Sequence, residues 1–286
     1  MKYSGIAILA LGLVAAGGPQ DDEAKARRAK VNDCQKRLEG ADEAAKTAAL
    51  EELAGINDDQ ARSLIGSKLT TDTDNVRRAA IKAIARQKRS SSAASLGRAV
   101  QGNLANEGLV RACIDALAEL DMCSGIQVLV MIIQFKNKLG SEALAAIEKI
   151  GCPDAIPPLL GILQRAEAEE KKPDRFEGAD VGGGGLGGMG GTGVGDEENK
   201  NKNKDLAGLA SKIRDTLSKL AGRGFPSHRE WMNALSSGQV RVKKASVFLC
   251  VKSNQTYDVP SDKTGKCPNP DPKSMHEEIF LKHKKE

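Results

Sequence analysis

The sequence predicts an all-α fold in which helix pairs repeat along the chain, with a small β-containing appendage at the C-terminal end. Three helical patterns align at a constant step of 33 residues: VRRAAIKAIA at 76–85, LVRACIDALA at 109–118 and EALAAIEKIG at 142–151. Within them, Ile81, Ile114 and Ile147 occupy equivalent positions. A constant step in this range is typical of repeat arrays, whose units bury their apolar faces only by stacking on neighbours. We therefore expect an α-solenoid of about four to five helix pairs.

A second helical pattern follows each of these three after a short polar break. The three segments are 92–101, 124–136 and 154–165. In the last of them Asp154 can cap the helix start, and Pro157 and Pro158 suit its first turn, where their missing N–H groups cost no hydrogen bond. Upstream, residues 47–56 and 59–69 predict an earlier and less regular pair, as expected of a terminal unit.

The segments DTDNVRRAAIKAIA, EGLVRACIDALAEL and PDAIPPLLGIL resemble repeats of the HEAT family in its short bacterial form. A 33-residue step is also the ankyrin period, but the T-P-L-H turn of ankyrin repeats is absent, as are the Trp, Gly and Tyr positions of a TPR unit. The resemblance covers roughly residues 41–164 and implies an α-solenoid that binds or scaffolds other molecules. It supplies no catalytic residues. An Ala-rich helical bundle is the alternative, which the constant step disfavours.

The N-terminal segment has the features of a signal peptide. Lys2 is followed by an apolar run at 5–16 that is too short to span a bilayer and ends in Val-Ala-Ala. We expect residues 1–16 to be removed and the protein to be secreted or periplasmic, with no stable membrane span. An uncleaved anchor is the alternative. The HEAT-like solenoid is then expected at 23–168.

A Gly-rich and charged stretch at 169–205 separates the solenoid from its predicted closing helices at 206–238. The stretch has no apolar periodicity, so we expect a flexible insertion within the last repeat. It lacks the preceding strand, the following helix and the Lys-Ser/Thr ending of a phosphate loop. Gly222 should stop the first closing helix, and Phe225 and Trp231 should seal the end of the array.

The C-terminal module at 245–286 is predicted to contain two short strands, at 247–249 and 256–259. Cys250 and Cys267 stand where a zinc ribbon carries the first cysteine of each Cys-x-x-Cys knuckle. The stretch S-D-K-x-G-K-C-P resembles small bacterial heavy-metal-binding ribbons.

The second cysteine of each predicted knuckle is replaced, by Ser253 and by Pro270. We therefore predict a ribbon without metal, in which Cys250 and Cys267 form a disulfide. The alternative is a zinc site that recruits His276 and His283 as further ligands; these two histidines lie in the charged tail.

Four other cysteines lie in the predicted helical region. Cys34 shares an apolar stripe with Val31 and Leu38, and Cys113 occupies a small-residue position between helices, so both should be buried thiols. Cys123 and Cys152 fall in equivalent turns of successive repeats. Stacking could bring them near each other, but an interaxial spacing of about 10 Å between neighbouring helices disfavours a bond, so the sequence leaves their pairing open.

Composition favours a protein partner over nucleic acid or substrate. The net charge is +5, acids and bases are mixed along the repeats, and one Trp and two Tyr offer little base stacking. All three His are C-terminal, and neither a Gly-x-Ser-x-Gly elbow nor a His-Glu-x-x-His helix is present. We expect no catalytic site and no cofactor.

The expected function is that of a non-enzymatic, exported scaffold that binds another protein through the concave face of the solenoid. That face should be lined by the second helices of the pairs. The candidate partner-binding residues are Arg62, Arg98, Gln101, Gln134 and Gln164. Two alternatives remain: a metal-handling protein that acts through the C-terminal module with zinc, and a structural subunit of a cell-envelope assembly.

Overall fold

The computed structural model describes residues 19–135, 137–171, 205–242, 246–250, 255–259 and 281–283. These residues form eleven α-helices and one three-stranded sheet, so the described chain is mostly α-helical. The predicted signal peptide at 1–16 lies outside them, as does almost all of the predicted insertion at 169–205.

Four helix pairs follow one another along the chain before residue 171. Their first helices are α2 (Glu43–Ala54), α4 (Asp74–Arg86), α6 (Glu107–Leu120) and α8 (Gly140–Ile150). Their second helices are α3 (Asp59–Ser67), α5 (Ser90–Gly102), α7 (Ile126–Phe135) and α9 (Ile156–Glu170). Short 3-10 turns precede three of these helices: η1 (Cys123–Gly125), η2 (Asn137–Leu139) and η3 (Pro153–Ala155). The helices lie where the repeated patterns predicted them.

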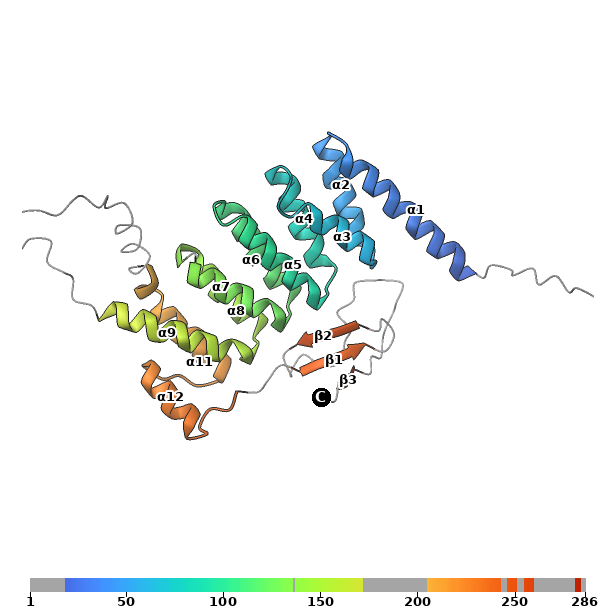
Figure 1. Ribbon diagram of the computed structural model, residues 1–286. Coiled ribbons are helices and arrows are strands. Elements are labelled where there is room, and N and C mark those ends of the chain that lie inside the picture. Colours follow the sequence, from blue (N-terminus) through green and yellow to red (C-terminus); the bar gives the residue numbers. More distant parts are fainter. Residues whose placement is uncertain are drawn as a thin grey trace, which may run out of the picture.

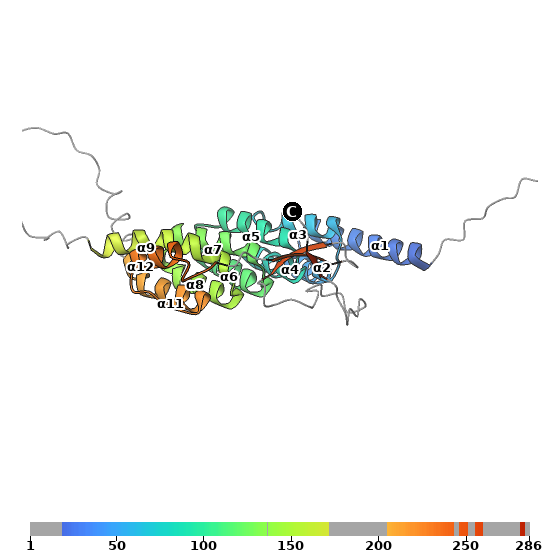
Figure 2. The ribbon, with the colours of Figure 1, turned by 90° about the horizontal axis from the view of Figure 1, so that it is seen from below.

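The pairs stack so that equivalent helices lie side by side. The first-helix layer comprises α2, α4, α6 and α8, and each of these helices packs against the next. The second-helix layer comprises α3, α5, α7 and α9. Within it, α7 packs against both α5 and α9. Figures 1 and 2 show the two layers from perpendicular directions. This arrangement is compatible with an α-solenoid-like helical repeat.

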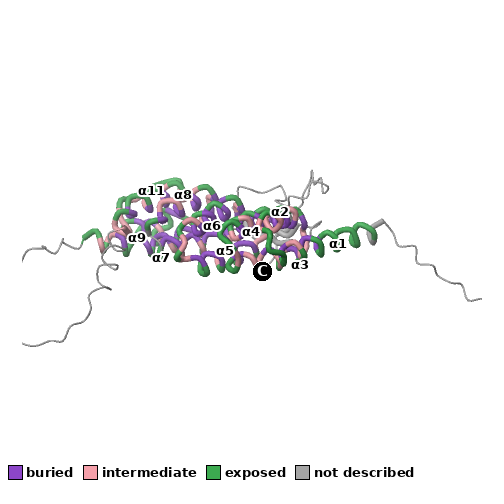
Figure 3. Tube along the Cα trace, turned by 90° about the horizontal axis from the view of Figure 1, so that it is seen from above, coloured by how far each residue is buried: buried purple, intermediate pink, exposed green. Residues whose placement is uncertain are grey.

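One continuous apolar core runs between the two layers. The equivalent residues Ile81, Ile114 and Ile147 are 0%, 3% and 0% exposed. Buried residues line the inside of the array and exposed residues its outside (Figure 3). Because each pair covers only one side of the next, the apolar faces are buried by neighbours rather than by a separate central core.

Polar side chains join neighbouring units where the apolar packing ends. The Nδ2 of the buried Asn103, just after α5, donates to the carbonyl oxygen of Leu69 at 3.0 Å. On the outer side, the Nε of Arg111 on α6 donates to the Oε2 of Glu142 on α8 at 2.7 Å. The bond from Asn103 satisfies a carbonyl of the preceding unit and so fixes how the two units stack.

Helix boundaries follow local sequence signals. The side-chain oxygens of Thr73 and Asn106 accept hydrogen bonds from backbone amides in the first turns of α4 and α6. Each cap satisfies an amide that has no partner within its own helix. Gly151 ends α8 with φ +68°, a left-handed conformation that glycine adopts without steric cost.

The start of α9 differs slightly from the sequence prediction. Pro157 and Pro158 lie in its first turn, as predicted. Asp154, which was expected to cap the helix, lies within η3 instead, and Ala155 occupies the cap position. The 3-10 turn brings the chain from α8 into α9 and so replaces a side-chain cap.

Beyond residue 209 the described chain forms α11 (Ala210–Ala221) and α12 (His228–Ser236). α11 packs against both α8 and α9, so it extends the first-helix layer, and α12 packs against α9. The packing is close at this end, because a Cβ on Gly140 would overlap a terminal methyl group of Leu209 unless that side chain moved.

The end of the array has its own small apolar cluster. Gly222 ends α11 with φ +71°, as the sequence predicted. Trp231 of α12 is fully buried, and its ring meets that of Phe225 edge-on with centroids 4.8 Å apart. Edge-to-face contact is a favoured geometry for two aromatic rings, so this pair stabilises the packing of α12.

At the other end, helix α1 (Pro19–Glu39) packs on α2 through its C-terminal half only. Val31, Cys34 and Leu38 are buried, which confirms the predicted apolar stripe, whereas residues 22–30 are all exposed. This charged half extends beyond the body of the array (Figure 1).

The C-terminal strands are β1 (Ser246–Cys250), β2 (Gln255–Val259) and β3 (Leu281–His283). They form an antiparallel sheet in the order β2-β1-β3. β2 lies beside α5 and η1, so the sheet is placed along the array rather than at its end (Figure 1).

Candidate protein-interaction surfaces

The structure places the five predicted partner-binding residues on four different helices. Arg98 and Gln101 lie on α5, Gln134 on α7 and Gln164 on α9, and all four are exposed. They belong to successive members of the second-helix layer. Their role in binding stays a prediction.

Arg62 differs from the other four predicted residues. It lies on α3 with its side chain 19% exposed, and its Nη2 lies 2.7 Å from a carboxylate oxygen of Asp59. The guanidinium of Arg89 pairs with the same carboxylate at 3.1 Å. Because Arg62 is already paired, it offers less free charge to a partner than an unpaired arginine does.

An exposed aromatic residue lies next to the predicted set. Phe135, at the end of α7, is 60% exposed and follows Gln134 directly. On the same helix, the sulfur of Met131 accepts a hydrogen bond from the Nε2 of Gln101 at 3.7 Å, which joins α5 to α7. Phe135 was not predicted, because its place in the helical pattern does not distinguish it from a core residue.

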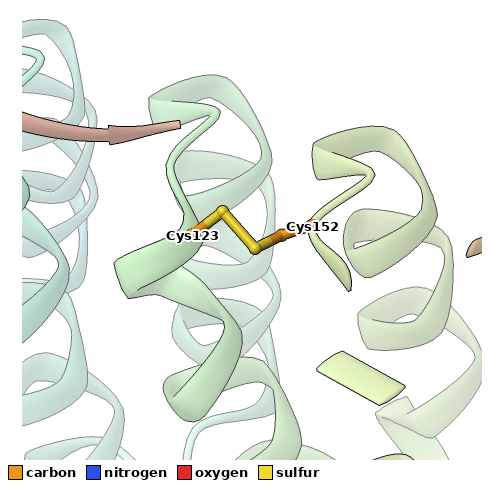
Figure 4. Close-up of a disulfide and its surroundings, with 2 residues drawn as sticks. All are labelled: Cys123 and Cys152. Carbon is orange, nitrogen blue, oxygen red and sulfur yellow. A yellow bond between two sulfur atoms is a disulfide. The ribbon is translucent and has the colours of Figure 1, made fainter. Parts of the chain in front are cut away.

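Cys123 and Cys152 form a disulfide, with their Cα atoms 5.6 Å apart (Figure 4). The sequence left this pairing open, because the spacing of helix axes disfavoured a bond. Both residues lie in turns, however: Cys123 opens η1 and Cys152 directly precedes η3. Consecutive turns of the array approach each other more closely than the axes of the helices that they connect, so the distance falls within the disulfide range.

This disulfide ties two successive helix pairs together. It joins the α6–α7 turn to the α8–α9 turn across a sequence separation of 29 residues. The two cysteines are 6% and 0% exposed. The covalent link is therefore shielded from solvent. It lies among the turns of the array, beside β2, which contacts η1.

The predicted buried thiols are confirmed. Cys113 is fully buried at a position that the neighbouring units fill with Ala80 and Ala146, and burial raises the pKa of its thiol to about 12. Cys34 is also fully buried; burial raises the pKa of its thiol, and the guanidinium of Arg37 opposes that rise. A thiol that stays protonated is a poor nucleophile, so neither residue marks a reactive site.

A buried carboxylate also has a structural role. Asp72, in the turn before α4, accepts hydrogen bonds from the ammonium groups of Lys46 at 3.0 Å and Lys68 at 3.2 Å, and from the amide of Thr73 at 2.9 Å. Burial by itself raises the pKa of the Asp72 carboxyl, but these three donors outweigh it and lower that pKa to about 2. The cluster joins α2 to the α3–α4 turn, because one carboxylate holds an ammonium group from each side.

The first-helix layer carries a groove that was not predicted from the sequence. This groove of about 190 Å³ lies between α2 and α4. Its charged lining comes mainly from Arg78, Lys82 and Arg86, which follow one another at intervals of four residues along α4. The spacing was visible in the sequence, but whether each cation is paired depends on neighbouring helices.

The predicted disulfide between Cys250 and Cys267 remains a prediction. Cys250 ends β1, and Cys267 lies outside the described residues. Of the alternative zinc ligands, His283 ends β3 and His276 also lies outside them. Among the residues that the structure does describe, no group of three or more His, Cys, Asp or Glu is placed to hold a metal ion.

None of the helices in the described part of the chain combines the length and the apolar character needed to cross a membrane.

In comparisons with known proteins, the chain matches no protein-family model and no curated protein sequence. The resemblance to HEAT repeats therefore depends on the repeated residues and on the stacking of equivalent helices.

Proposed function

We propose that this chain is an exported, non-enzymatic HEAT-like α-solenoid that binds another protein through its second-helix layer. The observation that carries the proposal is the stacking of equivalent helices across a step of 33 residues, around one continuous core. Arrays of this kind present long outer faces, and a face of that length suits a macromolecule better than a small ligand.

The composition of the second-helix layer supports its choice as the binding face. The helices α5, α7 and α9 carry exposed polar residues, and α7 also carries Phe135, the most exposed large hydrophobic residue of the described chain. Protein interfaces commonly combine an aromatic anchor with a polar rim. On the first-helix layer, by contrast, several outward charges pair across helices, as Arg111 does with Glu142 and Lys219 with Glu148.

Export is supported by the disulfide between Cys123 and Cys152. Structural disulfides persist in oxidising compartments and are rare in the cytosol, where thiols are kept reduced. The signal-peptide features of residues 1–16 point to the same compartment.

Site-specific photo-crosslinking in cells tests the proposed face. A photoreactive amino acid at Gln134 on α7 is expected to give a discrete crosslinked protein, whereas the same group at the exposed Lys149 on α8 is not. The crosslinked protein is then purified and its affinity measured for the wild-type chain and for Phe135→Glu. Lower affinity for the variant supports the proposal. Equal crosslinking from both positions, or equal affinity for both chains, contradicts it.

A further inference from the structure

The groove between α2 and α4 lies on the first-helix layer, and its binding properties go beyond the function proposed above. Thr47 and Glu51 of α2 form one wall, and Asn75 with three basic residues of α4 forms the other. Between the walls lie Ala79, half-buried, and Ala83, buried. Alanine side chains are short, so an extended chain has room to approach the helix surface between charged walls.

The three basic residues of this groove are exposed and unpaired. Within the described part of the chain, Arg78, Lys82 and Arg86 make no ion pair or side-chain hydrogen bond, whereas Arg77 on the same helix lies 2.5 Å from an oxygen of Asp74. Like charges four residues apart destabilise a helix slightly. The row therefore does not stabilise α4, and its charge is available to a ligand.

The row is particular to this unit. One step of 33 residues further on, the equivalent positions carry Arg111, Asp115 and Glu119. Of these, Arg111 is already paired with Glu142 at 2.7 Å. The basic row of α4 therefore does not continue onto α6.

The spacing of the cations matches that of side chains on an extended polypeptide. Residues four apart on a helix are separated by about 6 Å along its axis. Alternate residues of an extended chain point to the same side and lie about 6.6 Å apart. Carboxylates at alternate positions of one strand would therefore meet Arg78, Lys82 and Arg86 in turn.

The remaining lining favours a polypeptide over a nucleic acid. Glu51 places a carboxylate on the wall opposite the cations, where it can accept a hydrogen bond from a peptide N–H, a donor that a phosphate backbone lacks. The Thr47 hydroxyl and the Asn75 amide oxygen add further polar groups suited to a peptide backbone. No aromatic residue lines the groove, so bases would find no stacking partner there.

We propose that the α2–α4 groove binds an extended, acidic polypeptide segment, with its carboxylates at alternate positions paired to Arg78, Lys82 and Arg86. The contacts are exposed ion pairs, so the affinity is modest and falls as salt concentration rises.

Fluorescence anisotropy of the full chain with a labelled peptide of alternating Glu and Ser tests this proposal. Changing Arg78, Lys82 and Arg86 to Gln is expected to weaken binding about tenfold or more. The matched control changes three other exposed cations to Gln, which keeps the same net charge: Lys149, Arg165 and Arg229. This control should bind within about twofold of wild type. Circular dichroism confirms that both variants fold, and a single Lys82→Glu change gives a second, independent reading of the groove.

Three outcomes would overturn the proposal. The first is an equal loss of affinity in the control variant, which would show that net charge alone attracts the peptide. The second is equal binding of a peptide in which Gln replaces Glu. The third is tighter binding of a single-stranded oligonucleotide of the same charge, lost in the groove variant, which would identify a nucleic-acid site instead.

Discussion

Loss of the Cys123–Cys152 disulfide should destabilise the helical array by several kcal/mol. The bond closes a loop with a sequence separation of 29 residues. For a loop of this length, the reduced chain entropy of the unfolded state corresponds to about 3.6 kcal/mol at 25 °C. Replacing both cysteines with alanine also removes two buried sulfur atoms, which adds to the loss because the space around them is only partly refilled.

Urea unfolding, followed by the far-UV helical signal, measures the effect. With a denaturant slope of about 3 kcal/mol per molar urea, the double variant Cys123→Ala/Cys152→Ala should unfold about 1 M earlier than wild type. Reductant added to wild type breaks the bond but keeps the sulfur atoms, so it should produce most of this shift. Reductant added to the variant should have no effect on the helical signal and serves as the control.

The reasoning would be refuted by equal unfolding midpoints for wild type and the double variant in the absence of reductant. That result would mean either that the two cysteines are not joined in solution or that the link constrains chain segments that are already close together in the unfolded state.

Three other predictions follow from single residues. Ile114→Ala should cost about 2–5 kcal/mol, because this residue is 3% exposed in the core, whereas Asp115→Ala on the outer face should cost under about 0.5 kcal/mol; urea midpoints compare the two, and equal midpoints would contradict the repeat register. Asp72 has a lowered pKa of about 2, so its contribution to stability is complete above pH 4 and is lost as the pH falls towards 2. The variant Asp72→Asn should therefore cost on the order of 2 kcal/mol of unfolding free energy at pH 7 and little at pH 2. A cost that does not depend on pH would refute this account. Non-reducing peptide mapping of the exported protein should find Cys250 joined to Cys267; free thiols together with one bound zinc ion would favour the metal-binding alternative.

The sequence was sufficient to predict the helix pairs, because their apolar residues recur with both the helical period and the repeat period. Ile81, Ile114 and Ile147 identify three equivalent helices, and all three are buried. The end of α11 was equally predictable, since Gly222 supplies the left-handed residue that stops the helix. These features depend on local patterns, which a single sequence records directly.

Contacts between units were harder to predict. The bond between Cys123 and Cys152 depends on how closely two turns approach, and helix spacing is a poor guide to that distance. The groove was missed for a related reason: a mixed overall charge concealed one row of cations that have no partners. Whether a lysine such as Lys82 has an ion-pair partner depends on which residues of other helices lie beside it. Those neighbours are set by how the helices stack, which the sequence does not record directly.

Hydrogen exchange of the full chain, with and without its purified protein partner, tests the central claim most directly. Binding through the second-helix layer predicts slower exchange of amides in α5 and α7, at residues 90–102 and 126–135, when the partner is present. Amides of α6 and α8, on the first-helix layer, should keep their rates and serve as the internal reference. A bound partner that leaves α5 and α7 unchanged would contradict the account.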